Sequence, residues 1–264
     1  MACGRIADSA RSCRLVVPSG DGWSLTPAGK EALRSAELVE RAIGDAADVD
    51  VSAADNSPHG LVRVNPTEVF GVLVAAPALS TVCVQYPGIT VELTFYVGLT
   101  ATHAAPFDID VGIVKPRSPD LAVRRLPDCQ FGLYAGRSYL ATRPAPESLA
   151  DLAGHTSLYF IGATQNTQSN SGSELQNAML ASGVQLVGAS SVFAQLELIR
   201  YGAGIGTLPV YLAEQQRDLV RLLPGELEFS YAYWLSALHE NFTRPEVRVV
   251  CRALEERAHA MLDH

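Results

Sequence analysis

The stretch Trp23-Ser-Leu-Thr-Pro-Ala-Gly29 stands directly before an alanine-rich run with helical spacing. Thr26 is a residue type that accepts a hydrogen bond from a free backbone amide at a helix start, and Pro27 suits the first helical position because no donor is needed there. A helix is therefore predicted to begin near Thr26. Its apolar residues recur at alternating steps of four and three, the spacing of a narrow coiled-coil seam, which predicts a dimerising helix. These residues are Ala32, Ala36, Val39, Ile43 and Ala46.

The segment before this helix is Cys13-Arg-Leu-Val-Val-Pro-Ser-Gly-Asp-Gly22. A short hairpin, a Leu-Thr-Pro-Ala-Gly turn and a dimerising helix then follow one another, and in this order the chain resembles the wing and linker helix of LysR-type transcriptional regulators. A complete regulator of that family has a full helix-turn-helix ahead of the wing, with a recognition helix that reaches the major groove. Residues 1–12 show no apolar helical stripe long enough for such a unit. Residues 1–25 are therefore interpreted as a truncated winged-helix remnant.

Three explanations of this remnant stay open: a start codon placed too late, a truncated or rearranged gene, or an effector-domain protein that no longer reads DNA. The resemblance implies a wing that meets backbone phosphate rather than bases. The candidate DNA-contacting residues are Arg11, Arg14, Ser19 and Trp23. Residues 1–30 carry four basic and two acidic side chains, a modest excess that is equally typical of a solvated chain end.

The composition is that of a globular chain of 264 residues, 48% hydrophobic and 18% charged, which favours one or two domains. The 28 acidic and 20 basic residues give a net charge of −8, an unfavourable overall balance for approaching phosphates. No secretory signal opens the chain, and the longest apolar stretch, Val69 to Leu79, is too short to span a bilayer. We expect a cytoplasmic protein without membrane association.

Cysteine and histidine spacing offers no metal site. The five cysteines, at positions 3, 13, 83, 129 and 251, form no Cys-x-x-Cys pair, and the six histidines show no His-Glu-x-x-His spacing. Gly202-Ala-Gly-Ile-Gly206 follows a predicted helix and leads into a strand, the reverse of a phosphate-binding loop, so it is interpreted as a helix C-cap. Since there is also no nucleophile elbow and no Walker loop, we expect no metal, no cofactor and no enzymatic activity.

A change in composition divides the chain. Residues 45–58 lose helical periodicity and gather Asp, Ser, Ala and Asn, so residues 26–58 are expected to form the linker helix and a hinge. From His59 on, strand and helix patterns alternate, which predicts an α/β fold with a mostly parallel sheet, in two lobes. The predicted strands are 61–65, 89–96, 108–114, 121–126, 130–135, 157–161, 184–188, 204–208 and 232–237, and the predicted helices are 68–85, 173–181, 191–201, 210–216 and 245–262.

This second part also resembles the effector-binding domain of LysR-type regulators. The matching pieces are Gly60-Leu-Val-Arg-Val64, Tyr86-Pro-Gly-Ile-Thr-Val-Glu-Leu93, Phe107-Asp-Ile-Asp-Val-Gly-Ile113, Phe131-Gly-Leu-Tyr-Ala135 with Tyr139-Leu140, Arg200-Tyr-Gly-Ala-Gly-Ile-Gly-Thr-Leu-Pro209 and Arg244-Pro-Glu-Val-Arg248. The resemblance implies a two-lobed, periplasmic-binding-protein-like (type 2) domain over residues 59–264, with a small-molecule cleft between its lobes. One subdomain would comprise residues 59–135 and 240–264, and the other residues 136–239. Residues 100–106 depart from the more charged helix common there.

Two predicted strand ends carry candidate effector-binding residues, because ligands of open α/β sheets gather where strand ends meet helix N-termini. The first is Asn65-Pro66-Thr67 and the second is Ser190-Ser191, and the resemblance implies that both line the effector site. Thr67 is equally interpretable as a simple N-cap, and the two roles are compatible.

Lys115, Phe160 and Ile161 complete the candidates. Lys115 follows a strand near the predicted hinge, where it would pair with an effector carboxylate or remain a solvated loop charge. Phe160 and Ile161 end a strand before the polar run 163–173, which would close over a ligand or form a mobile surface loop. The helix N-termini favour a small anion or carboxylate as effector.

These patterns support two hypotheses. The first is a LysR-type DNA-binding transcriptional regulator, a homodimer or tetramer that binds promoter DNA and responds to a small-molecule effector held between two lobes. The second is a truncated effector-binding module without DNA binding, which acts as a dimer or through a protein partner. Binding to promoter DNA would separate them.

Overall fold

The computed structural model describes residues 15–19, 22–29, 31–32, 35, 57–95, 107–161, 185–227 and 229–263. Some predicted features lie outside these residues: Arg11, Arg14, the seam positions Ala36, Val39, Ile43 and Ala46, residues 100–106, the polar run 163–173 and the helix 173–181. They stay predictions.

A hairpin and a helix start form the N-terminal part. β1 (Val16–Ser19) pairs antiparallel with β2 (Gly22–Leu25), and helical residues follow from Pro27. The Thr26 hydroxyl accepts a hydrogen bond from the Gly29 amide at 3.0 Å, so the predicted N-cap is confirmed. The Thr26 amide donates to the Leu15 carbonyl at 3.0 Å, and a Cβ at position 29 would lie 1.9 Å from that same oxygen. Glycine is therefore required where the helix start meets the hairpin.

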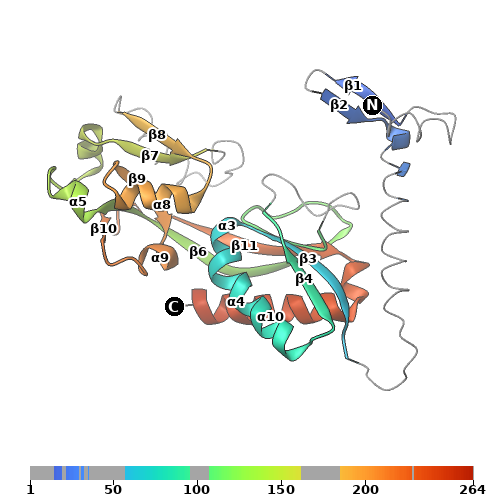
Figure 1. Cartoon of the computed structure of the whole chain (residues 1–264). Helices are drawn as coiled ribbons and strands as arrows, with labels where there is room; N and C mark the ends of the chain where they lie inside the picture. Colours follow the sequence, from blue (N-terminus) through green and yellow to red (C-terminus); the bar gives the residue numbers. More distant parts are fainter. Residues whose placement is uncertain are drawn as a thin grey trace.

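A nine-stranded sheet runs through the rest of the described chain in the order β4-β3-β5-β11-β6-β9-β7-β8, with β10 also paired to β6 (Figure 1). One lobe contains β3 (Gly60–Pro66), β4 (Ile89–Leu93) and β5 (Ile109–Gly112). The other contains β7 (Ser157–Phe160), β8 (Leu186–Ala189), β9 (Ile205–Pro209) and β10 (Leu219–Leu222). β6 (Leu121–Gly136) and β11 (Phe229–Leu238) are the long strands that join the two lobes.

The prediction of a mostly parallel sheet is wrong, because the sheet is mixed. The outer pairs β3–β4, β3–β5, β7–β8 and β7–β9 are parallel, as expected of strands linked by crossover segments. The central pairs β5–β11, β11–β6, β6–β9 and β10–β6 are antiparallel. The alternation of strands and helices predicted the outer pairs but not the direction of the two strands that connect the lobes.

The two strands predicted at 121–126 and 130–135 are one strand, β6. Pro127 lies between them and has no amide to donate to a ladder. The register with β11 shifts between Ala232 and Trp234, so that Leu126 and Pro127 together oppose Tyr233. This bulge accommodates the proline and lets the strand continue.

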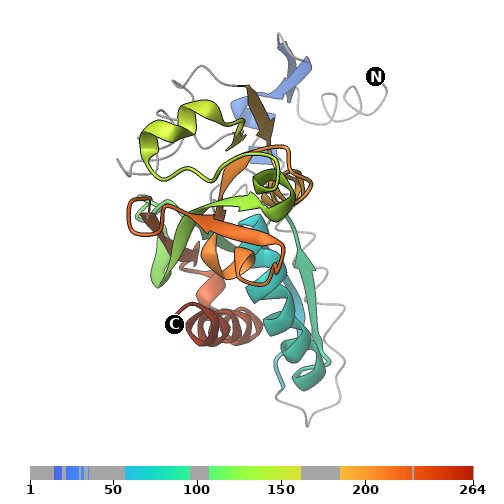
Figure 2. The same ribbon diagram turned by 90° about the vertical axis from the view of Figure 1, so that its left-hand side faces the viewer.

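One continuous helix covers the first lobe, as predicted for residues 68–85. It comprises α3 (Glu68–Phe70), a π-helical stretch (Gly71–Ala75) and α4 (Ala76–Gln85). α10 (Pro245–Leu262) has its predicted bounds and packs beside α4, which Figure 2 shows with α10 nearly end-on. A short 3-10 turn, Asn241–Thr243, precedes α10.

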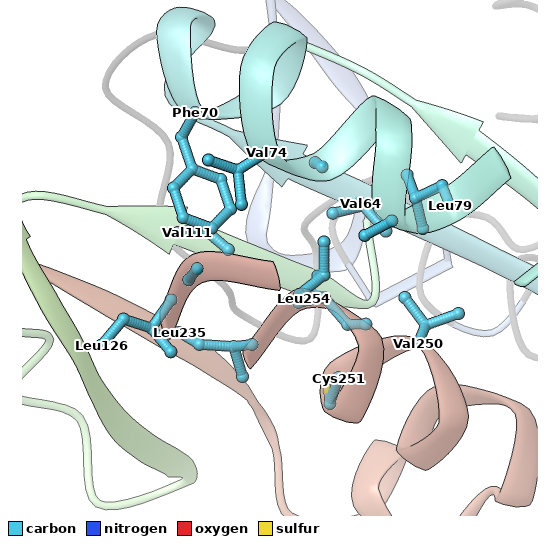
Figure 3. Close-up of a cluster of buried hydrophobic side chains, with 14 of the residues drawn as sticks. Val64, Phe70, Val74, Leu79, Val111, Leu126, Leu235, Val250, Cys251 and Leu254 are labelled. Atoms are coloured by element: carbon cyan, nitrogen blue, oxygen red, sulfur yellow. The ribbon is translucent and has the colours of Figure 1, made fainter. Parts of the chain in front are cut away.

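The helix Glu68–Gln85 is long and apolar enough, with a mean hydropathy of 1.6, to cross a membrane by length and composition alone. In the structure its inner face is part of the first lobe's core. The side chains of Phe70, Val74 and Leu79 point from this helix into the core that also holds Val111 of β5 and Val250 and Leu254 of α10 (Figure 3). Core helices pass the same test of length and composition, so this result is weak evidence for a span.

The second lobe is built around α8 (Val192–Arg200), which packs against β7, β8 and β9. Its shorter helices are α5 (Arg137–Leu140), α9 (Val210–Ala213) and the 3-10 turn Leu149–Gly154. Gly202 ends α8 with a φ of 80°, and its amide donates to the Ile199 carbonyl at 3.0 Å, which confirms the predicted C-cap. Gly204 then passes Thr156 so closely that a Cβ would lie 2.3 Å from its carbonyl oxygen.

Candidate functional site

The turn from β3 into α3 carries the first group of predicted residues, Asn65, Pro66 and Thr67. Thr67 precedes the helix with extended backbone angles, its amide donates to the Val111 carbonyl, and its carbonyl accepts the Gly71 amide, each at 2.8 Å. The side chain, however, makes no capping hydrogen bond. Its hydroxyl oxygen is buried and has no hydrogen-bond partner among the described residues. The N-cap interpretation is therefore right for the backbone and wrong for the hydroxyl.

The start of α8 carries the second group. Ser191 is the N-cap, and its hydroxyl accepts the Ala194 amide at 3.1 Å, as predicted for a capping serine. Ser190, beside it, is exposed. The end of β7 lies against this start, because Phe160 pairs with Ala189 and the Ile161 amide donates to the Ala189 carbonyl at 2.8 Å. Phe160 and Ile161 are thus brought next to Ser190 and Ser191.

Glu68, which the sequence reasoning missed, links the two groups. The Ser191 hydroxyl donates to Glu68 Oε1 and the Val192 amide donates to Glu68 Oε2, both at 2.7 Å. The β3–α3 turn of the first lobe and the N-terminus of α8 in the second lobe therefore meet directly. The predicted placement of these two strand ends side by side is a feature of the structure, while their contact with an effector stays a prediction.

A second missed residue, Asp110, lies in the same part of the first lobe. Asn65 Nδ2 donates to Asp110 Oδ1 at 2.8 Å, and in the sheet Asp110 stands opposite Asn65 on β3 and Ser236 on β11. Burial raises the pKa of Asp110 from 3.8 to about 6, and the Asn65 hydrogen bond opposes this shift only in part. The Ser236 hydroxyl is buried and has no partner among the described residues. An acidic residue inside the apolar strand Ile109–Gly112 was the sequence signal that could have indicated Asp110.

Lys115 lies elsewhere. Its ammonium is exposed and stands 5.0 Å from the centre of the Trp234 ring on β11, in cation–π geometry. No hydrogen bond or ion pair of the described chain joins Lys115 to Thr67 or Ser191. The structure therefore gives Lys115 an aromatic neighbour that neither sequence interpretation included.

A partly buried polar contact lies where the lobes join. Tyr211 of α9 and Tyr233 of β11 hydrogen-bond through their hydroxyls at 3.0 Å, and Phe70 packs on Tyr233 with ring centres 4.9 Å apart. Cys129 of β6 adjoins them, and burial raises the pKa of its thiol to about 12. The thiol is therefore protonated and unreactive at neutral pH.

The predicted DNA-contacting residues within the described chain are Ser19 and Trp23. They lie on the β1–β2 hairpin, where Trp23 pairs with Pro18 and Ser19 with Gly22. A two-stranded hairpin joined to a helix start is the local structure expected of a wing, and the contact of these residues with DNA stays a prediction.

The family model described as LysR substrate binding domain matches residues 55–259. An uncharacterized HTH-type transcriptional regulator of Haemophilus influenzae is 25% identical over 183 residues, which cover 68% of this chain and 63% of the relative. HTH-type transcriptional regulator PgrR of Escherichia coli is 27% identical over 124 residues, covering 47% and 42%. The chain thus spans less than two thirds of the length of these curated relatives.

Solved structures show the same fold. CrgA, a LysR-type transcriptional regulator from Neisseria meningitidis, is 22% identical with a TM-score of 0.65, over 96% of this chain and 86% of that chain. Full-length LysG from Corynebacterium glutamicum, with bound effector Arg, is 15% identical with a TM-score of 0.66, over 98% and 87%. The predicted two-lobed, periplasmic-binding-protein-like α/β fold is confirmed.

Proposed function

The chain belongs to the family of LysR-type transcriptional regulators, and from this premise we propose that it regulates transcription by binding promoter DNA in response to a small-molecule effector. The effector would lie between the lobes, with Asn65, Pro66 and Thr67 on one side. Ser190, Ser191, Phe160 and Ile161 would line the other side. No enzymatic step is part of this proposal.

One observation carries the placement of the effector: the buried, unpartnered hydroxyl of Thr67 lies next to the residue that reaches the N-terminus of α8. A buried hydroxyl without a partner costs about 1–3 kcal/mol, so a ligand that hydrogen-bonds to it would recover part of that energy. The N-terminus of α8 supplies backbone amides that favour a negative group. A small carboxylate satisfies both requirements, and arginine, which carries a carboxylate, is the bound effector of LysG, a regulator of similar fold.

The effector would act by changing the relation between the two lobes. A ligand shifts such an equilibrium only by binding one arrangement better than the other. We propose subdomains of residues 59–135 with 240–264 and of residues 136–239, linked through residues 26–58 to a partner helix in a homodimer or tetramer. The hairpin, with Arg11, Arg14, Ser19 and Trp23, would meet backbone phosphates.

A thermal denaturation series with small carboxylates, arginine among them, tests the effector site. A true effector is expected to raise the melting temperature, since a ligand at 100 times its Kd stabilises the folded state by about 2.7 kcal/mol. Thr67→Val and Ser191→Ala should both reduce this stabilisation. A carboxylate that stabilises the wild type and both variants equally would contradict the placement of the site.

A further inference from the structure

The contact between Glu68 and α8 joins parts of the chain that are 123 positions apart. Both oxygens of the Glu68 carboxylate are used, one by the Ser191 hydroxyl and one by the Val192 amide, at 2.7 Å each. These distances are those of hydrogen bonds to an ionised acceptor. The carboxylate also lies where the dipole of the nine-residue helix α8 favours a negative charge.

Nothing else in the described chain neutralises this carboxylate. No described lysine or arginine forms an ion pair with Glu68, whereas Glu197 on the same helix α8 pairs with Arg200 at 2.8 Å. Within the described chain, the charge of Glu68 is therefore met by hydrogen bonds from the Ser191 hydroxyl and the Val192 amide of α8.

Apolar packing surrounds the same contact. Val69, the next residue of α3, is 4% exposed and belongs to the core cluster of the second lobe, with Leu196 and Ile199 of α8. Leu73, one turn further along the helix, packs against that cluster too. The first-lobe helix therefore touches the second lobe through Glu68 and through apolar residues that include Val69 and Leu73. Of these three, Glu68 is the residue whose contact an anion could replace.

We propose that Glu68 is an internal carboxylate ligand that occupies the N-terminus of α8 in the effector-free protein, and that a carboxylate effector binds by displacing it. This inference rests on the proposed function, because it assigns the effector class of the same site. Glu68 then determines which effectors bind. An effector must carry an anionic group that accepts hydrogen bonds from the Val192 amide and the Ser191 hydroxyl better than the Glu68 carboxylate does. Glu68 also couples effector binding to the arrangement of the two lobes, because its displacement removes a contact between them.

The test is amide hydrogen exchange by NMR on the whole chain, for wild type, Glu68→Ala and Glu68→Gln. In the wild type the Val192 amide is expected to be protected by Glu68. In Glu68→Ala its protection should fall roughly tenfold to a hundredfold, which is the effect of losing a hydrogen bond to a charged group. The Ala194 amide, held by the Ser191 hydroxyl, should stay protected in the same sample and so report that α8 is folded. Glu197→Ala, which removes a carboxylate from the same helix, is the matched control.

Sodium acetate then serves as the probe anion. In Glu68→Ala we expect acetate to shift the Val192 amide resonance and to restore its protection, while sodium chloride at equal ionic strength does less. In the wild type and in Glu197→Ala acetate should have little effect at Val192. Glu68→Gln, which keeps the shape and one acceptor oxygen, should give an intermediate loss of protection even if Glu68→Ala proves unstable.

Equal Val192 protection in the wild type and both Glu68 variants would overturn the proposal, and so would an acetate response of the same size in the wild type and Glu68→Ala. These readouts need neither DNA nor the natural effector. If the wild type fails to bind promoter DNA, the proposed function is contradicted but the hydrogen-exchange results are unchanged. A failure of the proposed function can therefore be distinguished from a failure of the Glu68 inference.

Discussion

At the scale of single residues, Asp110 is a buried acid of the first lobe whose pKa is raised by burial. Because its folded pKa of about 6 lies above its ordinary value of 3.8, the folded state binds the proton more tightly than the unfolded chain. The contribution of this group to the free energy of unfolding is therefore expected to fall as pH rises from below 3.8 to above about 6. Asp110→Asn keeps an oxygen that accepts from Asn65 and removes the charge.

As pH rises from acidic to neutral, the wild type should lose stability that Asp110→Asn keeps. The difference in unfolding free energy between the two should therefore grow by on the order of 3 kcal/mol in favour of Asp110→Asn, since each pKa unit corresponds to about 1.4 kcal/mol. Urea denaturation at several pH values measures the difference, with the exposed Glu256→Gln on α10 as the control. Parallel pH profiles for wild type and Asp110→Asn would contradict a raised pKa at this site.

The cysteines allow a second test at this scale. Cys129 is fully buried with a raised thiol pKa, whereas Cys83 is exposed on α4. A thiol reagent applied to the native protein is expected to modify Cys83 promptly and Cys129 only as fast as the protein unfolds. Peptide mapping by mass spectrometry separates the two sites, and labelling of Cys129 at the rate of Cys83 would show that the junction between the lobes is open.

At the scale of elements, α8 depends on its first residues. Ser191 caps the helix and also donates to Glu68, so Ser191→Ala removes two hydrogen bonds at once. We expect a loss of about 1–2 kcal/mol in unfolding free energy, in the range of a lost N-cap. Ser190→Ala, one position earlier and exposed, should change stability by less than about 0.5 kcal/mol. Equal urea midpoints for the two variants would argue against the capping contact.

Elements with local signals were predictable from the sequence. α10 has its predicted bounds because Pro245 suits a first turn. Its apolar residues at helical spacing, Val247, Val250, Leu254 and Ala258, are all fully buried. The sequence did not predict that residues 121–136 form one strand, β6. The bulge that accommodates Pro127 depends on pairing with β11, more than a hundred positions away. Strand direction at the centre of the sheet is likewise a property of the assembled lobes.

At the scale of the whole molecule, the candidate site depends on contacts between distant segments. Sequence reasoning placed Thr67 and Ser191 at two strand ends that meet, since helix starts after strands have a known chemistry. Glu68 was missed because its partner lies on the other lobe, and no local pattern distinguishes it from an ordinary first-turn acid. Whether the Thr67 hydroxyl would cap its own helix or stay unpaired was also undecidable before the turn was seen in three dimensions.

The two lobes, the hairpin and the helix start at Thr26 together make up the proposed regulator. The measurement that tests this most directly is fluorescence-anisotropy binding of the 264-residue chain to labelled DNA from its own upstream region, against scrambled DNA, across a salt series. The account predicts sequence-selective binding that weakens as salt rises and changes when a stabilising carboxylate is added. Absence of binding at low salt would contradict it and leave an effector-binding module that acts without reading DNA.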